Sequence, residues 1–255
     1  MDIGTNKVED ILEFLKKSNF KRIFVICGLN SFKKLSIKKD LDNLNNNYEF
    51  EYYFKKNFLP IYEELVDLTI KMKRFDPDVI LAIGGGSVID LAKISNCIEI
   101  SDSLKNHIKN YSYPYKKKFT KLVAIPTTAG SGAESTSNAV IYLDNIKYSF
   151  ESEKLKPDFF FLIPELLLSS SHKINASAGF DALAQAMESL IAIKSNEQSI
   201  LYSKKSIELN EKYFLKFLEN PNHELSAKML IASNLAGKAI DITKTTIPHA
   251  VSYPF

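Results

Sequence analysis

The sequence predicts an N-terminal α/β domain built on a parallel sheet, followed by an all-α domain. In the first half of the chain, short apolar segments alternate with amphipathic helical segments, which is typical of a parallel sheet covered by helices. Beyond Pro164 only long segments with helical periodicity follow. We therefore place the α/β domain over residues 1–163 and the helical domain over residues 164–255.

Each expected element rests on its own pattern. A first helix is expected over Val8–Lys17, whose apolar residues recur at helical spacing. The expected strands are the short apolar runs Arg22–Cys27, Tyr48–Phe54, Val79–Ile83, Leu122–Ile125 and Phe159–Ile163. Two helices separate the middle strands, over Ile61–Arg74 after Pro60 and over Ser87–Ile98 after three glycines. The helical domain is expected to contain Ala176–Ile193, Gln198–Leu218 and Glu224–Ile240.

Composition excludes several classes of protein. Lys and Arg number 33 against 30 Asp and Glu, a balance that argues against a nucleic-acid partner. No apolar run approaches the roughly 20 residues that span a membrane, and the first residues lack the features of a signal peptide. Cys27 and Cys97 lie in apolar stretches, which favours free thiols in a reducing, cytoplasmic setting.

A glycine turn at Gly84–Gly86 lies between an expected strand and an expected helix. Glycines let the backbone approach a ligand closely, and a helix N-terminus attracts phosphate. The turn lacks the third glycine of the dinucleotide fingerprint, because Ile89 occupies that position, and no Walker A lysine follows. The alternative is a tight turn in which Ser87 caps the helix; we favour the phosphate site.

A second polar loop, Pro126–Thr136, follows the next buried strand. Ligands of open α/β sheets bind outside the carboxyl ends of the strands, so this loop and the glycine turn are expected to serve one ligand. Taken alone, the loop reads equally well as a hydroxyl-rich surface segment.

Metal-binding side chains are expected in the helical domain. Asp181 and Gln185 are four residues apart, which places both on one face of a helix. Asp and His are common metal ligands, and Gln is a weak neutral one. His249 is the third candidate. The alternatives are a helix cap or a surface carboxylate for Asp181, an ordinary helix-face residue for Gln185 and a structural histidine for His249.

Taken together, these segments resemble the iron-containing (group III) alcohol dehydrogenase family. The matching stretches occur in the expected order over most of the chain: Gly84–Lys93, Pro126–Thr136, Pro157–Leu166, Gly179–Glu188 and Lys244–Phe255. The resemblance implies a Rossmann-like dinucleotide domain and a helical metal-binding domain, a dehydroquinate synthase-like architecture. It implies hydride transfer between a nicotinamide cofactor and a small aldehyde or alcohol, and the last segments look most like phosphonoacetaldehyde reductases.

The resemblance also implies which residues bind the cofactor. The pyrophosphate would be held by Gly86 and Ser87, in a pocket shaped by Gly85 and Asp90. The nicotinamide side would be lined by Thr127, Thr128 and Ser131, with Lys147 near the cofactor. At Gly28, where members that prefer NAD often carry Asp, no negative charge opposes a 2′-phosphate, and Lys33 and Lys34 follow. We therefore expect NADPH to be preferred over NADH.

For the metal, the resemblance assigns Asp181, Gln185 and His249 as ligands of Fe²⁺ or Zn²⁺, and no catalytic side chain beyond them. Gln185 stands where most members have His, and an amide oxygen suits a hard ion better than Fe²⁺. The family's last histidine ligand lies beyond the position that matches Phe255, so the sequence is expected to be truncated. A homodimer is compatible with the resemblance.

Two other readings remain open. The chain could be a truncated, non-catalytic fragment that still binds nucleotide. It could also resemble the related dehydroquinate synthase or glycerol-1-phosphate dehydrogenase group, although the Pro126–Gly132 loop followed by the Asp181–Gln185 helix fits alcohol dehydrogenases better.

Overall fold

The computed structural model describes residues 4–44, 47–245 and 249. The chain forms two compact units. The α/β unit comprises residues 8–125 and 137–160, and the helical unit comprises the described parts of residues 1–7, 126–136 and 161–255. Packing units need not coincide with domains, so the division between residues 163 and 164 stays a prediction.

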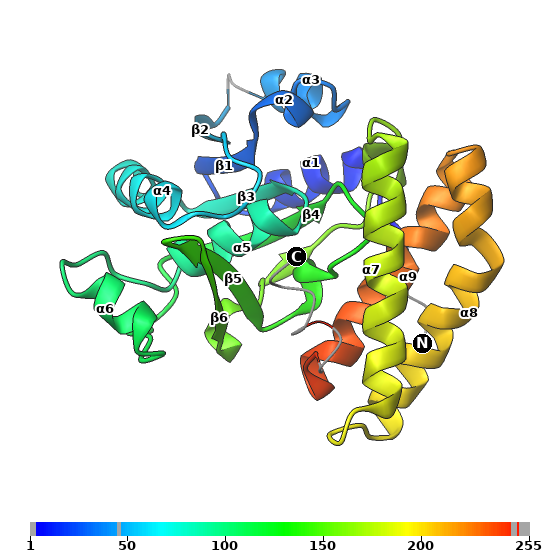
Figure 1. Ribbon diagram of the computed structural model, residues 1–255. Coiled ribbons are helices and arrows are strands. Elements are labelled where there is room, and N and C mark those ends of the chain that lie inside the picture. Colours follow the sequence, from blue (N-terminus) through cyan, green and yellow to red (C-terminus); the bar gives the residue numbers. More distant parts are fainter. Residues whose placement is uncertain (1–3, 45–46, 246–248, 250–255) are drawn as a thin grey trace. The chain divides into compact units, whose positions relative to one another are not determined.

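The α/β unit is built on a five-stranded sheet in the order β2-β1-β3-β4-β7 (Figure 1). Its strands are β1 (Arg22–Gly28), β2 (Glu49–Lys55), β3 (Val79–Gly84), β4 (Lys121–Pro126) and β7 (Phe159–Phe160). β1 pairs in parallel with both β2 and β3, and β4 pairs in parallel with β7. The predicted parallel sheet is therefore confirmed. β3 is fully buried and β1 is buried except at its two ends, because both faces of the sheet are covered.

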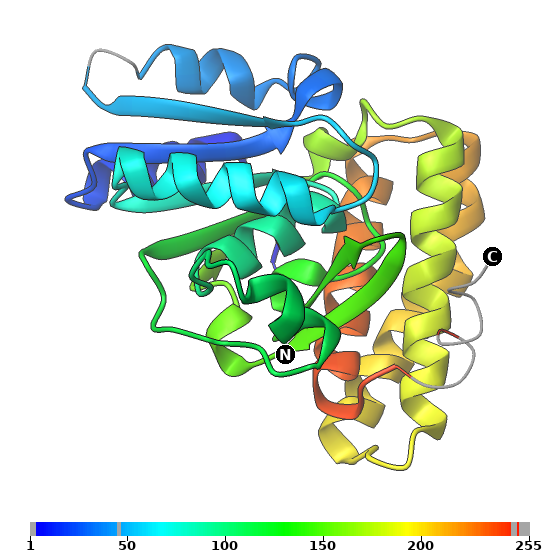
Figure 2. The same ribbon diagram turned by 60° about the vertical axis from the view of Figure 1, so that its left-hand side comes forward.

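Helices cover both faces of this sheet. α4 (Tyr62–Phe75) and α5 (Gly86–Ser95) pack side by side on one face, and α1 (Val8–Lys17) and α3 (Ile37–Asp42) contact each other on the other (Figure 2). Right-handed crossovers require this arrangement, because the chain reverses its direction across the sheet at β2. The short helices α2 (Leu29–Phe32) and α6 (Leu104–Lys109) were not predicted.

The sequence analysis also missed an antiparallel hairpin formed by β5 (Asn138–Leu143) and β6 (Ile146–Glu151). Asp144 and Asn145 connect the strands, both with positive φ. A two-residue Asp-Asn connection between alternating buried and exposed residues is typical of a primed hairpin turn, so the signal was present. The 3₁₀ turns η1 (Ala133–Ser135) and η2 (Glu153–Leu155) flank the hairpin in sequence.

The last strand is shorter than predicted. β7 ends at Phe160, whereas the apolar run continues to Ile163. Both backbone groups of Leu162 bond to Asn6: its N–H donates to Asn6 Oδ1 over 3.0 Å, and its carbonyl accepts from the Asn6 N–H over 2.7 Å. These contacts belong to the helical unit and replace the strand pairing that the prediction assumed.

The helical unit contains η3 (Pro164–Leu167), α7 (His172–Ile191), α8 (Glu197–Glu219) and α9 (His223–Thr243). Three long helices lie side by side in it (Figure 1). α7 begins four residues before the predicted start, because the Ser171 hydroxyl accepts from the Ile174 N–H and caps the helix. Asn196 and Asn222 cap the other two helices in the same way. Within the described part of the chain, every helix is too short or too polar to cross a membrane.

Candidate functional site

The glycine turn connects β3 to α5 in the α/β unit. Gly85 has extended backbone (φ −73°, ψ −178°) and is the N-cap of α5, with no side-chain cap. The alternative with Ser87 as the cap is therefore wrong, since Ser87 lies inside the first turn. Uncapped first-turn N–H groups at a helix N-terminus are the feature that binds phosphate. The neighbouring carboxyl end of β1 is Gly28, which pairs in register with the buried Lys55.

Two side chains of α5, the helix that follows the glycine turn, bond to the β5–β6 hairpin. Asp90 Oδ2 accepts from the Val140 N–H over 3.1 Å, and Lys93 Nζ donates to the Asn138 carbonyl over 3.0 Å. Burial raises the pKa of Asp90 to about 6, against the opposing effects of Lys93, Val140 and Lys147. Asp90 and Lys147, which were predicted separately, thus interact electrostatically. Lys93, which was not predicted, helps to hold the hairpin against α5.

The second polar loop belongs to the helical unit. The Thr127 carbonyl accepts from the Ser170 hydroxyl over 3.3 Å, and Ser131 Oγ accepts from the Ala133 N–H over 3.4 Å. The buried Glu134 accepts from Asn234 Nδ2 of α9 over 2.8 Å. Thr127, Thr128 and Ser131 therefore belong to the helical unit, whereas the glycine turn, Asp90, Lys147 and Gly28 belong to the α/β unit.

The structure brings the three predicted metal-binding side chains together within the helical unit. Gln185 Nε2 donates to Asp181 Oδ2 over 3.0 Å, and His249 Nε2 lies 3.2 Å from Asp181 Oδ1. Asp181 lies in the middle of α7, so it is not the helix cap that the alternative required. Beside it, Gly179 allows the close approach of α8, because a Cβ there would lie 2.2 Å from the Phe214 ring.

The structure adds a fourth member, Glu188, to which the sequence analysis assigned no role. Its Oε1 forms a short hydrogen bond with His249 Nδ1. Glu188 lies seven residues after Asp181 on α7, on the same helical stripe as Gln185, and is only 5% exposed. The hydrogen bond with Asp181 raises the pKa of His249, opposed by burial and reinforced by Glu188. The i, i+7 spacing is the sequence signal that would have identified it.

A divalent ion requires several oxygen or nitrogen donors around one point. Gln185 Oε1 is buried and has no hydrogen-bond partner among the described residues, as expected of an oxygen available to a cation. Among these residues, no three His, Cys, Asp or Glu side chains are arranged around a common point. Asp181, the Gln185 amide and His249 therefore fit an ion only as a mixed oxygen and nitrogen set, with the amide as an essential member.

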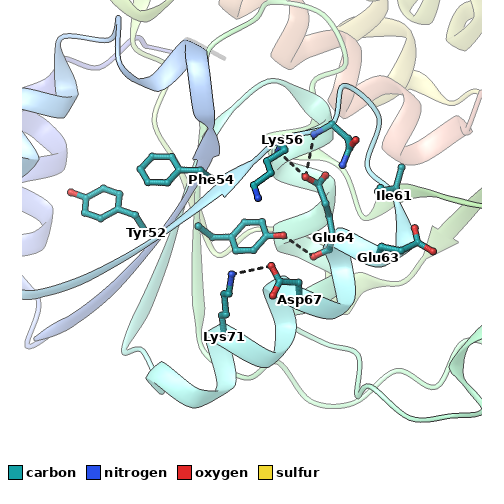
Figure 3. Close-up of a pocket in the computed structure, with 10 residues that line it drawn as sticks. Tyr52, Phe54, Lys56, Ile61, Glu63, Glu64, Asp67 and Lys71 are labelled. Carbon is teal, nitrogen blue, oxygen red and sulfur yellow. Dashed lines mark hydrogen bonds and ion pairs between the residues drawn. The ribbon is translucent and has the colours of Figure 1, made fainter.

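A separate cavity of about 330 Å³ lies between β2 and α4 (Figure 3). Its polar side chains interact mainly with one another: Lys71 pairs with Asp67, and Glu64 Oε1 accepts from the N–H groups of Lys56 and Asn57. None of the predicted cofactor or metal residues lines it. We assign Glu64 a structural role, because it holds the loop after β2.

A glycine turn on a parallel sheet, together with a helix whose carboxylate and amide side chains meet an imidazole from later in the chain, is typical of metal-dependent dehydrogenases that use a nucleotide. Residues 2–164 match the family described as iron-containing alcohol dehydrogenase, and residues 175–255 match the C-terminal domain of that family. The chain belongs to the iron-containing alcohol dehydrogenase family.

Relatives and solved structures agree with this assignment. The chain is 26% identical to a mitochondrial hydroxyacid-oxoacid transhydrogenase of Xenopus tropicalis, over 98% of this chain and 60% of the relative. It is 29% identical to a 1-propanol dehydrogenase of Citrobacter freundii, over 95% and 63%. The chain thus spans about 60% of the length of these relatives.

Among solved structures, a sulfoacetaldehyde reductase from Bifidobacterium kashiwanohense in complex with NAD⁺ superposes with a TM-score of 0.90. It is 25% identical, with 98% of this chain and 67% of that chain covered. The iron-containing alcohol dehydrogenase of Thermotoga maritima gives a TM-score of 0.86 at 26% identity, over 100% and 71%. The predicted fold class, an α/β part with a parallel sheet followed by a helical part, is confirmed.

Proposed function

We propose that the chain is an NAD(P)H- and metal-dependent alcohol dehydrogenase that interconverts a small aldehyde and its alcohol. The observation that carries the proposal is the cluster of Asp181, Gln185 and His249 in a chain of this family. When bound, a divalent ion would supply Lewis acidity at the substrate oxygen and the nicotinamide would supply the hydride.

The chain's own residues would bind and orient these groups. The uncapped turn at Gly85–Ser87 would hold the pyrophosphate, and Asp90 with Lys93 would fix the hairpin that carries Lys147. Thr127, Thr128 and Ser131 would line the nicotinamide side. The metal would be held by Asp181, Gln185 and His249. No further side chain is assigned to proton transfer.

For the cofactor, we propose a preference for NADPH. Gly28 offers no carboxylate to a ribose 2′-hydroxyl, and the exposed Lys33 and Lys34 follow it. Lys55 lies on the neighbouring strand end in register with Gly28, but its buried Nζ donates to the carbonyls of Asn57 and Phe58, so the phosphate would depend on Lys33 and Lys34. The comparison of kcat/KM for NADPH and NADH tests this. A preference of more than tenfold for NADH would refute it.

The substrate is proposed to be a small aldehyde, and phosphonoacetaldehyde is the specific candidate. A neighbouring structure is that of a reductase of sulfoacetaldehyde, another two-carbon aldehyde with an anionic group. Oxidation of NADPH should be measured with phosphonoacetaldehyde, sulfoacetaldehyde and propanal, together with the metal content of the protein. Stoichiometric metal with turnover supports an enzyme, whereas equal rates with all three aldehydes would refute selection of the anionic group.

A second candidate is a nucleotide-binding protein without turnover. It is favoured by an apolar stripe on α7, where Phe180, Met187 and Ile191 are 65%, 55% and 79% exposed. Exposed apolar patches of this kind are typical of interaction surfaces. Binding of NADPH without metal uptake or aldehyde reduction would establish this candidate instead.

A further inference from the structure

We infer that Glu188 is a positioning residue of the metal site, which holds His249 in the orientation that presents Nε2 to the ion. The inference rests on the proposed metal-dependent function. It concerns a residue that contributes no ligand itself. The contact that carries it is the short hydrogen bond between Glu188 Oε1 and His249 Nδ1.

The chemistry of the two groups determines the direction of this bond. An ionised carboxylate only accepts hydrogen bonds, so the proton lies on His249 Nδ1 in this contact. Nε2 is then the ring nitrogen that faces Asp181, at 3.2 Å from its Oδ1. A carboxylate that accepts from one imidazole nitrogen fixes the ring and its tautomer for metal binding through the other.

Ring geometry separates this role from that of a ligand. The two nitrogens of an imidazole point in different directions, so an ion shared by Nε2 and Asp181 lies away from the carboxylate at Nδ1. Consistent with this, Asp181, Glu188 and His249 do not surround a common point. Glu188 therefore acts through His249.

The placement of Glu188 also favours a specific role. Its side chain is only 6% exposed, at the C-terminal end of the helical stripe that carries Asp181 and Gln185. A carboxylate loses much of its hydration at such a site, which is unfavourable unless strong hydrogen bonds compensate. The bond to His249 provides this compensation and holds the imidazole against α7.

The test is a Co²⁺ titration of the wild-type chain and of Glu188→Ala, Glu188→Gln and His249→Ala, followed by affinity and by the visible spectrum of the bound ion. Glu188→Ala should weaken Co²⁺ binding by about 10- to 100-fold and shift the spectrum toward that of His249→Ala. Glu188→Gln, which keeps an acceptor oxygen and the same shape, should bind Co²⁺ with an affinity between those of wild type and Glu188→Ala. Glu208→Gln, which removes an exposed carboxylate of α8, is the matched control and should behave as wild type.

A double-mutant cycle decides between positioning and direct ligation. If Glu188 acts through His249, Glu188→Ala should change Co²⁺ affinity by less than twofold once His249 is Ala. A further tenfold loss in that background would make Glu188 a ligand and overturn the inference. Wild-type affinity in both Glu188 variants would overturn it as well. A wild-type chain that binds no Co²⁺ would instead refute the proposed metal-dependent function, and the inference with it.

Discussion

Gly237→Ala is the substitution for which local propensity and packing predict opposite outcomes. Gly237 lies in the interior of α9, where alanine is ordinarily about 1 kcal/mol more favourable than glycine. A Cβ at this position would lie 2.6 Å from the Gly132 carbonyl oxygen, 2.8 Å from Gly132 Cα and 2.5 Å from Ser135 Oγ. Two of these atoms belong to the backbone, so the loop itself would have to move.

The loop has little freedom to move, because Gly132 has a positive φ of 58° and the neighbouring Glu134 is bonded to Asn234. Overpacking of this kind costs about 1–3 kcal/mol, against a gain of about 1 kcal/mol in helix propensity. We expect a net loss of up to about 2 kcal/mol, which corresponds to a decrease in Tm of up to roughly 8 °C for a chain of this size.

The measurement is thermal or urea unfolding of Gly237→Ala beside Gly4→Ala, a position where a Cβ meets nothing within 4 Å. The control should unfold within about 1 °C of wild type, since it adds no contact. An increase in the stability of Gly237→Ala would show that helix propensity dominates, and the close contact between α9 and the loop would be refuted.

Three further predictions concern ionisation and the metal. Burial raises the pKa of Asp90 to about 6, so wild type should lose up to about 3 kcal/mol of stability relative to Asp90→Asn as pH rises from 4 to 6; parallel unfolding curves would contradict this. At Asp158, burial opposes ionisation, but bonds from the Leu122 N–H and Lys118 outweigh it and lower the pKa. Asp158→Asn should therefore be less stable than wild type at neutral pH, and urea titrations should show that difference shrinking as pH falls below about 4. Gln185→His replaces an amide with an imidazole and should raise Zn²⁺ affinity at least about tenfold, which competition with a chelator measures.

The elements that the sequence predicted correctly are those whose information is local. The strand Val79–Gly84 is a continuous apolar run because both of its faces are buried, and Pro60 comes shortly before α4, as predicted. The hairpin was missed although Asp144 and Asn145 mark its turn, because its strands alternate between buried and partly exposed residues and lack the continuous burial of the core strands. The end of β7 could not be predicted, since Asn6, more than 150 residues away in the chain, bonds to Leu162.

In the candidate site, too, the features that could be predicted are those set by neighbouring residues in the sequence. The spacing of Asp181 and Gln185 was sufficient to predict that they share a helix face, and the structure agrees. The bond between Glu188 and His249 joins residues 61 positions apart. The i, i+7 spacing could place Glu188 on the same stripe as Asp181, but no periodicity could place it against His249. Only the fold of the helical unit shows which nitrogen of His249 each carboxylate faces.

The assignment of the Pro126–Thr136 loop to the helical unit has a physical basis that also bears on function. Although β4 leads directly into the loop, Gly130 packs so closely on α7 that a Cβ would lie 2.9 Å from Ala178 Cα and Cβ. Ala178 comes three residues before Asp181, about one helical turn. Gly130 of the loop is thus packed against α7 about one turn before the first proposed metal ligand. Packing this close leaves the loop backbone at Gly130 little room to shift relative to Asp181.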